Sequence, residues 1–176
     1  MSTQNYFELG GVAIPYEAHL DISQTYDVLQ ASTWPPVRMM NGDAKVQTAW
    51  GNKIKTTITG RGWMPSAWDG LDYKQPMLLK CAGGRVIGSQ SNAISIPSAR
   101  RSEAFYLPHG YAIVGGRKVE SPVSMAGDTA TVTVVAAATG YGVIYYPEIT
   151  VYAKASQTDI NLAVAEFGWQ IEAEEI

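Results

Sequence analysis

Apolar and polar residues alternate most regularly in the last forty residues of the chain. Apolar side chains take every second position in residues 145–154, and they do so again in residues 166–174. A period of two is that of a strand with one buried face. We expect two amphipathic strands here, joined by a polar loop at residues 156–161. The side chains expected to share the buried face are Ile149, Val151, Phe167, Trp169 and Ile171.

A second group of strands is expected between residues 37 and 81. Asn41 and Gly42 separate two extended runs, and both tolerate the positive φ of a tight hairpin turn. Residues 53–59 alternate between two faces, and residues 77–81 form a further short apolar run. We predict three or four strands of one antiparallel sheet, around which the rest of the chain is arranged. A loop rich in Gly and Trp, at residues 60–73, separates the last two.

The remaining segments are shorter. Residues 20–29 fit a strand or a helix, and their Thr, Tyr and Val content favours a strand. Trp34-Pro35-Pro36 predicts an extended entry into the hairpin. Residues 89–102 predict a long loop that is either functional or ordered by a partner. Short strands are expected at residues 85–88, 103–107, 111–114, 119–125 and 130–135.

The spacing of Gly and Pro residues along the chain indicates the fold class. Its 17 Gly and 9 Pro interrupt the sequence at short intervals, and few segments have the period of a long helix. This pattern favours an all-β protein, an antiparallel β-sandwich or open barrel with extended loops. The length of 176 residues is enough for one domain with its own core. We expect a single domain over residues 1–176, with an N-terminal arm of about ten residues and long loops near residues 60–73 and 89–102.

Charge and cysteine content exclude several classes. The formal net charge of −3 excludes the broad basic field of a nucleic-acid binder. Cys81 is the only cysteine, so no internal disulfide forms, and two His leave no zinc site of standard ligand count. The first twenty residues have no signal-peptide pattern, and residues 132–138 are too short to span a bilayer. We expect a soluble protein folded in a reducing cytoplasm, or released from one.

Candidate chemistry is sparse. Cys81 could pair with His19 or His109, but it closes an apolar run, where Cys is usually a small core residue. Residues 69–72 hold two Asp and predict a turn in preference to a calcium loop. Gly83-Gly84-Arg85 lacks the spacing of a phosphate-binding loop. We expect no catalytic residues, no cofactor and no metal, and therefore no enzyme.

Aromatic side chains are the feature that a plain core does not fully explain. Four Trp fall at predicted strand ends or in glycine-rich loops, where Trp is typical of protein contacts and sugar sites. The alternative is that these rings cap the ends of a sandwich. Arg100-Arg101 is a local basic site or a solvated turn. The candidate subunit contacts are Trp50, Trp63, Trp68, Tyr73, Arg100 and Arg101, with Trp34 as a further loop Trp.

Two segments carry a resemblance to a known family. The first comprises VRMMNG at residue 37, KVQTAW at residue 45, TTITGRGWMP at residue 56 and GLDY at residue 70. The second comprises YPEITV at residue 146 and FGWQIEAEE at residue 167. Together they resemble small virion proteins of long-tailed bacteriophages, particularly those that infect pseudomonads.

The resemblance implies a structural subunit of a phage tail, made in the bacterial cytoplasm and built on a β-sandwich. It implies homomeric rings, commonly sixfold, around a channel that DNA crosses only as cargo, with other tail or baseplate proteins as neighbours and no membrane insertion. A distal ring at the tail tip or baseplate is our first interpretation. The alternatives are the major tail tube protein, and a carbohydrate-binding β-sandwich for host attachment that uses Trp63, Trp68 and Tyr73 as stacking platforms.

Overall fold

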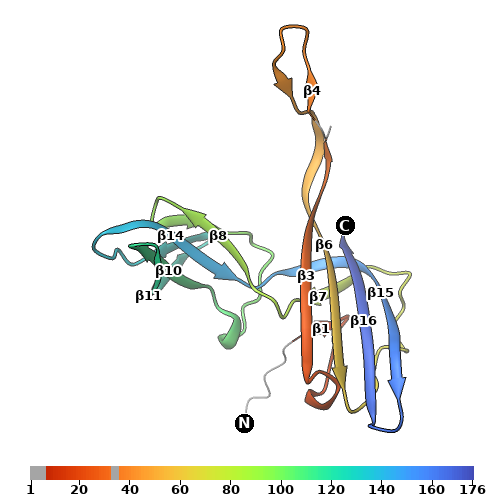
Figure 1. Cartoon of the computed structure of the whole chain (residues 1–176). Coiled ribbons are helices and arrows are strands. Elements are labelled where there is room, and N and C mark those ends of the chain that lie inside the picture. Colours follow the sequence, from red (N-terminus) through yellow and green to blue (C-terminus); the bar gives the residue numbers. More distant parts are fainter. Residues whose placement is uncertain (1–6, 33–35) are drawn as a thin grey trace. The chain divides into compact units, whose positions relative to one another are not determined.

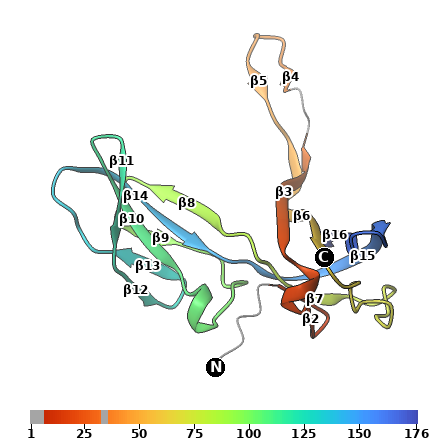
Figure 2. The same cartoon turned by 60° about the horizontal axis from the view of Figure 1, so that its bottom comes forward.

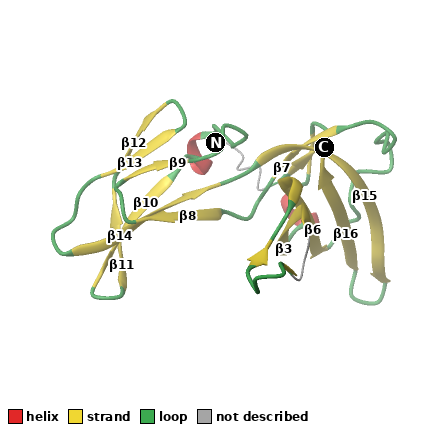
Figure 3. Cartoon of the chain, turned by 90° about the horizontal axis from the view of Figure 1, so that it is seen from above, coloured by secondary structure: helices red, strands yellow, loops and turns green. Residues whose placement is uncertain are grey.

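Strands make up nearly all the regular structure of the chain. The computed structural model describes residues 7–32 and 36–176, and the strand pairs recorded within them are antiparallel. Among these residues the only helical elements are two short 3₁₀ turns, η1 (Tyr16–Ala18) and η2 (Ala104–Tyr106) (Figure 3). The predicted all-β fold is confirmed.

The chain divides into two compact units, where the sequence predicted a single domain. The arm unit comprises Ile14–Met77 and Thr150–Ile176, and it is named for a hairpin arm described below. The insert unit comprises the chain up to Ala13 together with Leu78–Ile149. Each unit has its own buried side chains, and each is described by itself.

Four neighbouring strands of one antiparallel sheet form the arm unit (Figure 1). Its strands, in the order β15-β16-β6-β3, are β15 (Glu148–Asn161), β16 (Glu166–Glu175), β6 (Thr48–Gly62) and β3 (Asp21–Ser32). Ile171 lies opposite Ile58, and Trp169 lies opposite Gly60. Because facing residues share a side of the sheet, the apolar residues of three strands form one buried face. Its buried members are Ile54, Thr56, Ile58, Val151, Ala153, Trp169, Ile171 and Ala173.

The alternation predicted for both C-terminal strands is confirmed from Glu148 onward, and so is the strand at residues 20–29. Two details were wrong: Tyr145 ends an earlier strand, β14 (Ala138–Tyr145), and Phe167 is half-buried where a buried side chain was expected. The polar loop predicted at residues 156–161 was wrong, because β15 continues to Asn161 and the turn follows it. Hydroxyl and amide side chains suit the solvated face of a strand as well as they suit a loop. Polarity alone did not mark the end of this strand.

Trp169 is the centre of the buried face of the arm unit. Its indole N–H donates to the backbone carbonyl of Ala18 in η1 at 2.6 Å, and its ring meets that of Trp68 edge to face at 4.9 Å. Gly60 lies under the indole, where any Cβ would overlap the ring. The loop after β6 thus folds back and supplies Trp68 to the core.

Two facing sheets form the body of the insert unit (Figure 2). The strands of the first, in order, are β11 (Arg117–Ser121), β10 (His109–Val114), β14 (Ala138–Tyr145) and β8 (Arg85–Ser89). Those of the second are β12 (Val123–Ala126), β13 (Thr129–Val132) and β9 (Ala93–Ser95). Both sheets contribute to one cluster, with Ile94 and Val132 from the second and Ala112 and Val143 from the first. This is a small β-sandwich.

Residues 7–13 are also part of the insert unit. Strands β1 (Glu8–Leu9) and β2 (Val12–Ala13) form a hairpin, and β1 pairs with β7 (Met77–Lys80). Phe7 and Leu9 are buried. The N-terminal arm expected over the first ten residues was therefore wrong for residues 7–10, and residues 1–6 lie outside the described part.

Three further predictions for the insert unit needed correction. Residues 103–107 form η2 and not a strand. The strand expected at residues 119–125 is split into β11 and β12 at Pro122, which lacks the N–H that a continuous ladder needs. The long loop expected at residues 89–102 contains β9, with Ile94 and Ile96 buried. No helix in the described residues is long and apolar enough to cross a membrane.

Candidate interaction surfaces

The Asn41-Gly42 hairpin is present, but it is not the centre of the fold. Strands β4 (Val37–Arg38) and β5 (Ala44–Lys45) pair only with each other, and Gly42 takes a φ of +88° at the turn. The backbone N–H of Met39 donates to the carbonyl of Asp43 at 2.8 Å. The predicted single sheet over residues 37–81 was wrong for the hairpin, because β4 and β5 form a sheet of their own and are not part of the sheet that contains β6.

The hairpin forms the tip of an arm, defined here as residues 36–50, that continues from β3 and β6 beyond the sheet (Figure 1). Every described residue from Val37 to Trp50 is exposed. The large apolar side chains exposed there are Val37, Met39, Met40, Val46 and Trp50. A two-stranded ribbon is only marginally stable alone in water, and exposed apolar groups on it are typical of a contact surface.

A bulge lies where the arm joins the sheet. The pairing of β3 with β6 shifts register between Leu29 and Ala31, and Asn52 on β6 has a φ of +64°. A bulge of this kind bends and twists a ribbon, and Asn is one of the few residues that tolerates the left-handed region. The direction of the arm is therefore set by the backbone at its base.

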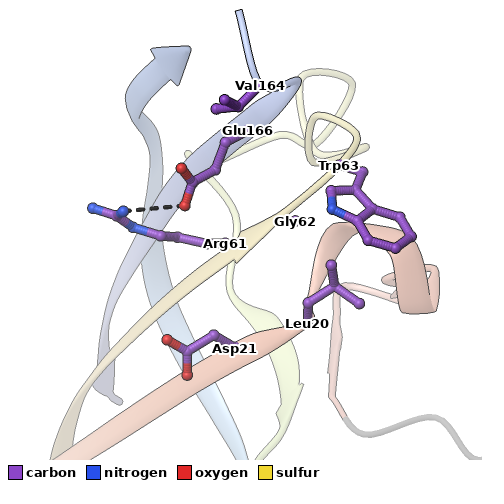
Figure 4. A pocket seen from close by; sticks show the side chains of 7 residues that line it. All are labelled: Leu20, Asp21, Arg61, Gly62, Trp63, Val164 and Glu166. Atoms are coloured by element: carbon purple, nitrogen blue, oxygen red, sulfur yellow. Dashed lines mark hydrogen bonds and ion pairs between the residues drawn. The ribbon is translucent and has the colours of Figure 1, made fainter. Parts of the chain in front are cut away.

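A groove lies at the other end of the same sheet, where β6 ends and β16 begins. It has a volume of about 510 Å³ and is lined by Leu20, Asp21, Arg61, Gly62, Trp63, Val164 and Glu166 (Figure 4). The guanidinium of Arg61 pairs with the carboxylate of Glu166 at 3.1 Å. Trp63 is 64% exposed, and its backbone N–H donates to the carbonyl of Glu17 at 2.6 Å. The indole is thus held in place by its backbone while its ring faces solvent.

The groove lies within a larger exposed apolar surface. Ile160 lies near the end of β15, Leu162 lies in the turn between β15 and β16, and Met64 follows Trp63, with all three side chains exposed. No feature of the sequence indicated that Ile160, Leu162 or Met64 is functional. The same holds for the groove residues Leu20, Asp21, Arg61, Val164 and Glu166. Their proximity depends on strand register, because Asp21 lies opposite Arg61 on β6, and Gly62 lies opposite Phe167 on β16.

The six candidate contact residues fall into different environments. Trp50 is exposed on the arm and Trp63 is exposed in the groove, so both are available to a partner. Trp68 is only 1% exposed, and Tyr73 is half-buried with its hydroxyl donating to the Trp68 carbonyl at 3.0 Å. The prediction of Trp68 as a subunit contact was wrong, because its ring packs against that of Trp169 in the core. Trp34 lies outside the described residues.

The two arginines are structural and do not form a solvated basic pair. Arg100 donates to the carboxylate of Asp128 at 2.8 Å and to the carbonyl of Gly127 at 2.9 Å, which fixes the turn between β12 and β13. Arg101 is 2% exposed, donates to the carbonyl of Cys81 at 3.0 Å and lies 3.3 Å from the centre of the Tyr106 ring. The prediction of Arg101 as a subunit contact was wrong, since a side chain buried in its own unit has no surface to offer a partner.

The remaining candidates for chemistry have structural contacts of their own. Cys81 is fully buried, as expected for a core residue. The ring of His19 bonds to the carbonyl of Pro15 at 2.7 Å, and Asp72 accepts from the backbone N–H of Lys74 at 3.1 Å, as in a capped turn. Among the described residues no group of three or more His, Cys, Asp or Glu is placed to hold a metal ion.

Comparison of the chain with protein-family models, with curated proteins and with solved structures gave no match. We therefore infer the function from the two exposed surfaces of the arm unit and from the resemblance of two sequence segments to virion proteins of long-tailed bacteriophages. Most of the first segment of that resemblance lies in the arm and in β6, and much of the second lies in β15 and β16.

Proposed function

We propose that the protein is a structural subunit of a bacteriophage tail, which assembles with copies of itself into a ring at the tail tip or baseplate. The observation that carries the proposal is the arm, a ribbon of described residues exposed on all sides whose large apolar side chains have no partner surface in the arm unit. An isolated monomer would expose these groups to water, and a neighbouring copy would bury them.

The edge of the sheet offers a second means of association. Strand β3 ends the strand order of the arm unit, so its outer edge has no strand partner among the described residues. Over Asp21–Leu29 it pairs with β6 without a register shift. A long regular edge strand favours pairing with another chain. Edge pairing between copies is a direct route to a closed ring.

The test is the oligomeric state of the purified full-length chain, measured by light scattering and negative-stain microscopy. We expect rings or larger assemblies for the unmodified protein. The variant Met39→Ser/Met40→Ser should keep its strand spectrum and its unfolding midpoint but lose assembly. The matched control is Val86→Ser/Val134→Ser, which removes equally exposed apolar groups from the insert unit. A monomer at all concentrations would contradict the proposal.

The carbohydrate-binding alternative is weakened by burial. Of its three stacking platforms, Trp68 and Tyr73 are occupied within the arm unit and only Trp63 faces solvent. A glycan array distinguishes the two functions, since a monomer that binds sugars through Trp63 and never assembles would replace the structural proposal. The tail tube alternative predicts long tubes in the microscope where a tail-tip protein predicts single rings.

A further inference from the structure

We propose that the arm tip of one copy docks in the groove of the next copy, so that subunits associate head to tail. The inference rests on the proposed self-assembly and names the partner surface for the arm. The two surfaces differ in shape: the arm is a projecting ribbon and the groove is a recess with exposed apolar walls.

The arm of one copy cannot reach the groove of the same copy. The arm leaves the sheet at the start of β6, near Thr48, and the groove lies at the end of β6, at Gly62. A strand rises about 3.3 Å per residue, so the 15 residues of β6 separate the two surfaces by roughly 45 Å. The groove and the arm tip lie at opposite ends of one continuous strand, and contact between them requires two copies.

The side chains of the two surfaces suit each other. The arm tip presents Met39, Met40 and Val46, and Met is flexible enough to fill an irregular apolar recess. The groove presents Leu20, Trp63 and Val164. Aromatic side chains and Met are enriched at protein–protein contacts.

The charges also differ in sign. The arm carries Arg38 and Lys45 against one carboxylate, Asp43. The groove carries Asp21 and Glu166 against one cation, Arg61, and Glu17 is exposed on the adjoining η1. Opposite charges around an apolar contact steer association and fix its register.

The groove is formed before any partner arrives. Gly62 packs so closely on the backbone of Glu17 and Ala18 that a Cβ would clash there, and the Arg61–Glu166 ion pair ties β6 to β16. A preformed recess loses little conformational entropy on binding. Because arm and groove are different surfaces, the contact is heterologous, and it repeats until it closes into a ring or continues as a stack.

A complementation experiment tests the contact directly. The variant Met40→Asp blocks the arm and leaves the groove intact, whereas Trp63→Asp blocks the groove and leaves the arm intact. We expect each variant alone to be unable to make the arm–groove contact. A mixture should form one-to-one complexes, detected by native mass spectrometry with one variant isotope-labelled. If pairing along the edge of β3 still closes each variant into a ring, the mixture should give complexes in which a ring of one variant is joined to a ring of the other.

The outcomes separate this inference from the proposed function. If the unmodified chain assembles but the mixture forms no unlike pairs, the structural proposal stands and the arm–groove contact is overturned. If the unmodified chain stays monomeric, the proposed function itself fails. Binding of the groove to a glycan, lost in Trp63→Asp with no unlike pairs formed, would assign the groove to sugar and overturn the contact. Arg38→Glu in the Trp63→Asp partner should weaken pairing roughly two- to fivefold, the effect of one exposed ion pair.

Discussion

At the scale of single residues, Trp169 joins three parts of the arm unit. Its N–H bonds to η1, its ring meets Trp68 from the loop after β6, and its face covers Gly60 on β6. Few side chains could replace it, because the indole fills the space that Gly60 leaves open. The stability of the arm unit therefore depends on this one ring more than on any exposed aromatic residue.

We predict that Trp169→Ala destabilises the fold by roughly 3–5 kcal/mol, since it empties a large buried site. Trp68→Ser should also destabilise it, because the lost ring is buried against Trp169. Urea denaturation measures both. Trp50→Ala, which removes the same side chain from an exposed position, is the control and should leave the midpoint nearly unchanged. An unshifted midpoint for Trp169→Ala would show that the proposed core face is wrong.

The carboxylate of Glu103 links stability to pH in the insert unit. Burial by itself raises the pKa of Glu103, but its own backbone N–H and hydrogen bonds from Lys80 and Arg101 outweigh burial and lower this pKa below its ordinary value of 4.5. A carboxyl with a lowered pKa in the folded state stabilises the fold above its ordinary pKa. That contribution is lost as the pH falls through the folded value.

We therefore predict that the unmodified chain loses more stability than Glu103→Gln between pH 7 and pH 3. The difference in unfolding free energy between the two should be largest near neutral pH and should shrink below about pH 4.5. Urea denaturation at several pH values measures it. Glu120→Gln is the control, because that side chain is 89% exposed. If the difference in unfolding free energy between Glu103→Gln and the unmodified chain stayed constant from pH 7 to pH 3, the assignment of a lowered pKa to Glu103 would be contradicted.

At the scale of elements, residues 89–102 illustrate how a polar segment is ordered within its own chain. Ile94 and Ile96 enter the sandwich core, and the N–H of Ile96 donates to the carbonyl of Asp128 at 2.9 Å. The sequence predicts a loop here that is either functional or ordered by a partner. Pairing of β9 with β13 orders the segment within its own chain, so it gives no support to ring formation.

We predict that the amides of Ile96 and Val132 are already protected from hydrogen exchange in the monomeric variant Met40→Asp. Both donate to backbone carbonyls across the β9–β13 pair, and both side chains are buried. Exchange followed by mass spectrometry or NMR gives the protection factors. If these amides exchanged freely in the monomer and were protected only after assembly, a partner would be needed to order residues 89–102.

Strand periodicity could be read from the sequence because it depends on local burial alone. The alternation of β15, β16 and β6 was predicted on this basis, whereas the turn at Asn41-Gly42 was predicted from the backbone preference of those two residues. Partner choice between strands could not be read, because it depends on long-range register. Trp68 was assigned to the surface because the sequence cannot show that Gly60 leaves room for the ring that Trp68 packs against.

At the scale of the whole molecule, the two exposed surfaces belong to one unit. The arm and the groove both lie in the arm unit, and residues 78–149 interrupt that unit between β6 and β15. The insert unit has a separate hydrophobic cluster and its own sandwich. Stability and association should therefore be separable by substitutions in different units.

We predict that Ile94→Ala lowers the stability of the insert unit by roughly 2–5 kcal/mol without weakening the arm–groove contact. Ile94 is 3% exposed in the sandwich core and belongs to neither surface. The two measurements are urea denaturation of the single variant and the affinity of the Met40→Asp and Trp63→Asp pair with Ile94→Ala added to both. Unchanged affinity under native conditions, together with a lower unfolding midpoint, is the expected result. A tenfold loss of affinity would mean that the contact depends on the insert unit, and the assignment of both surfaces to the arm unit would then be wrong.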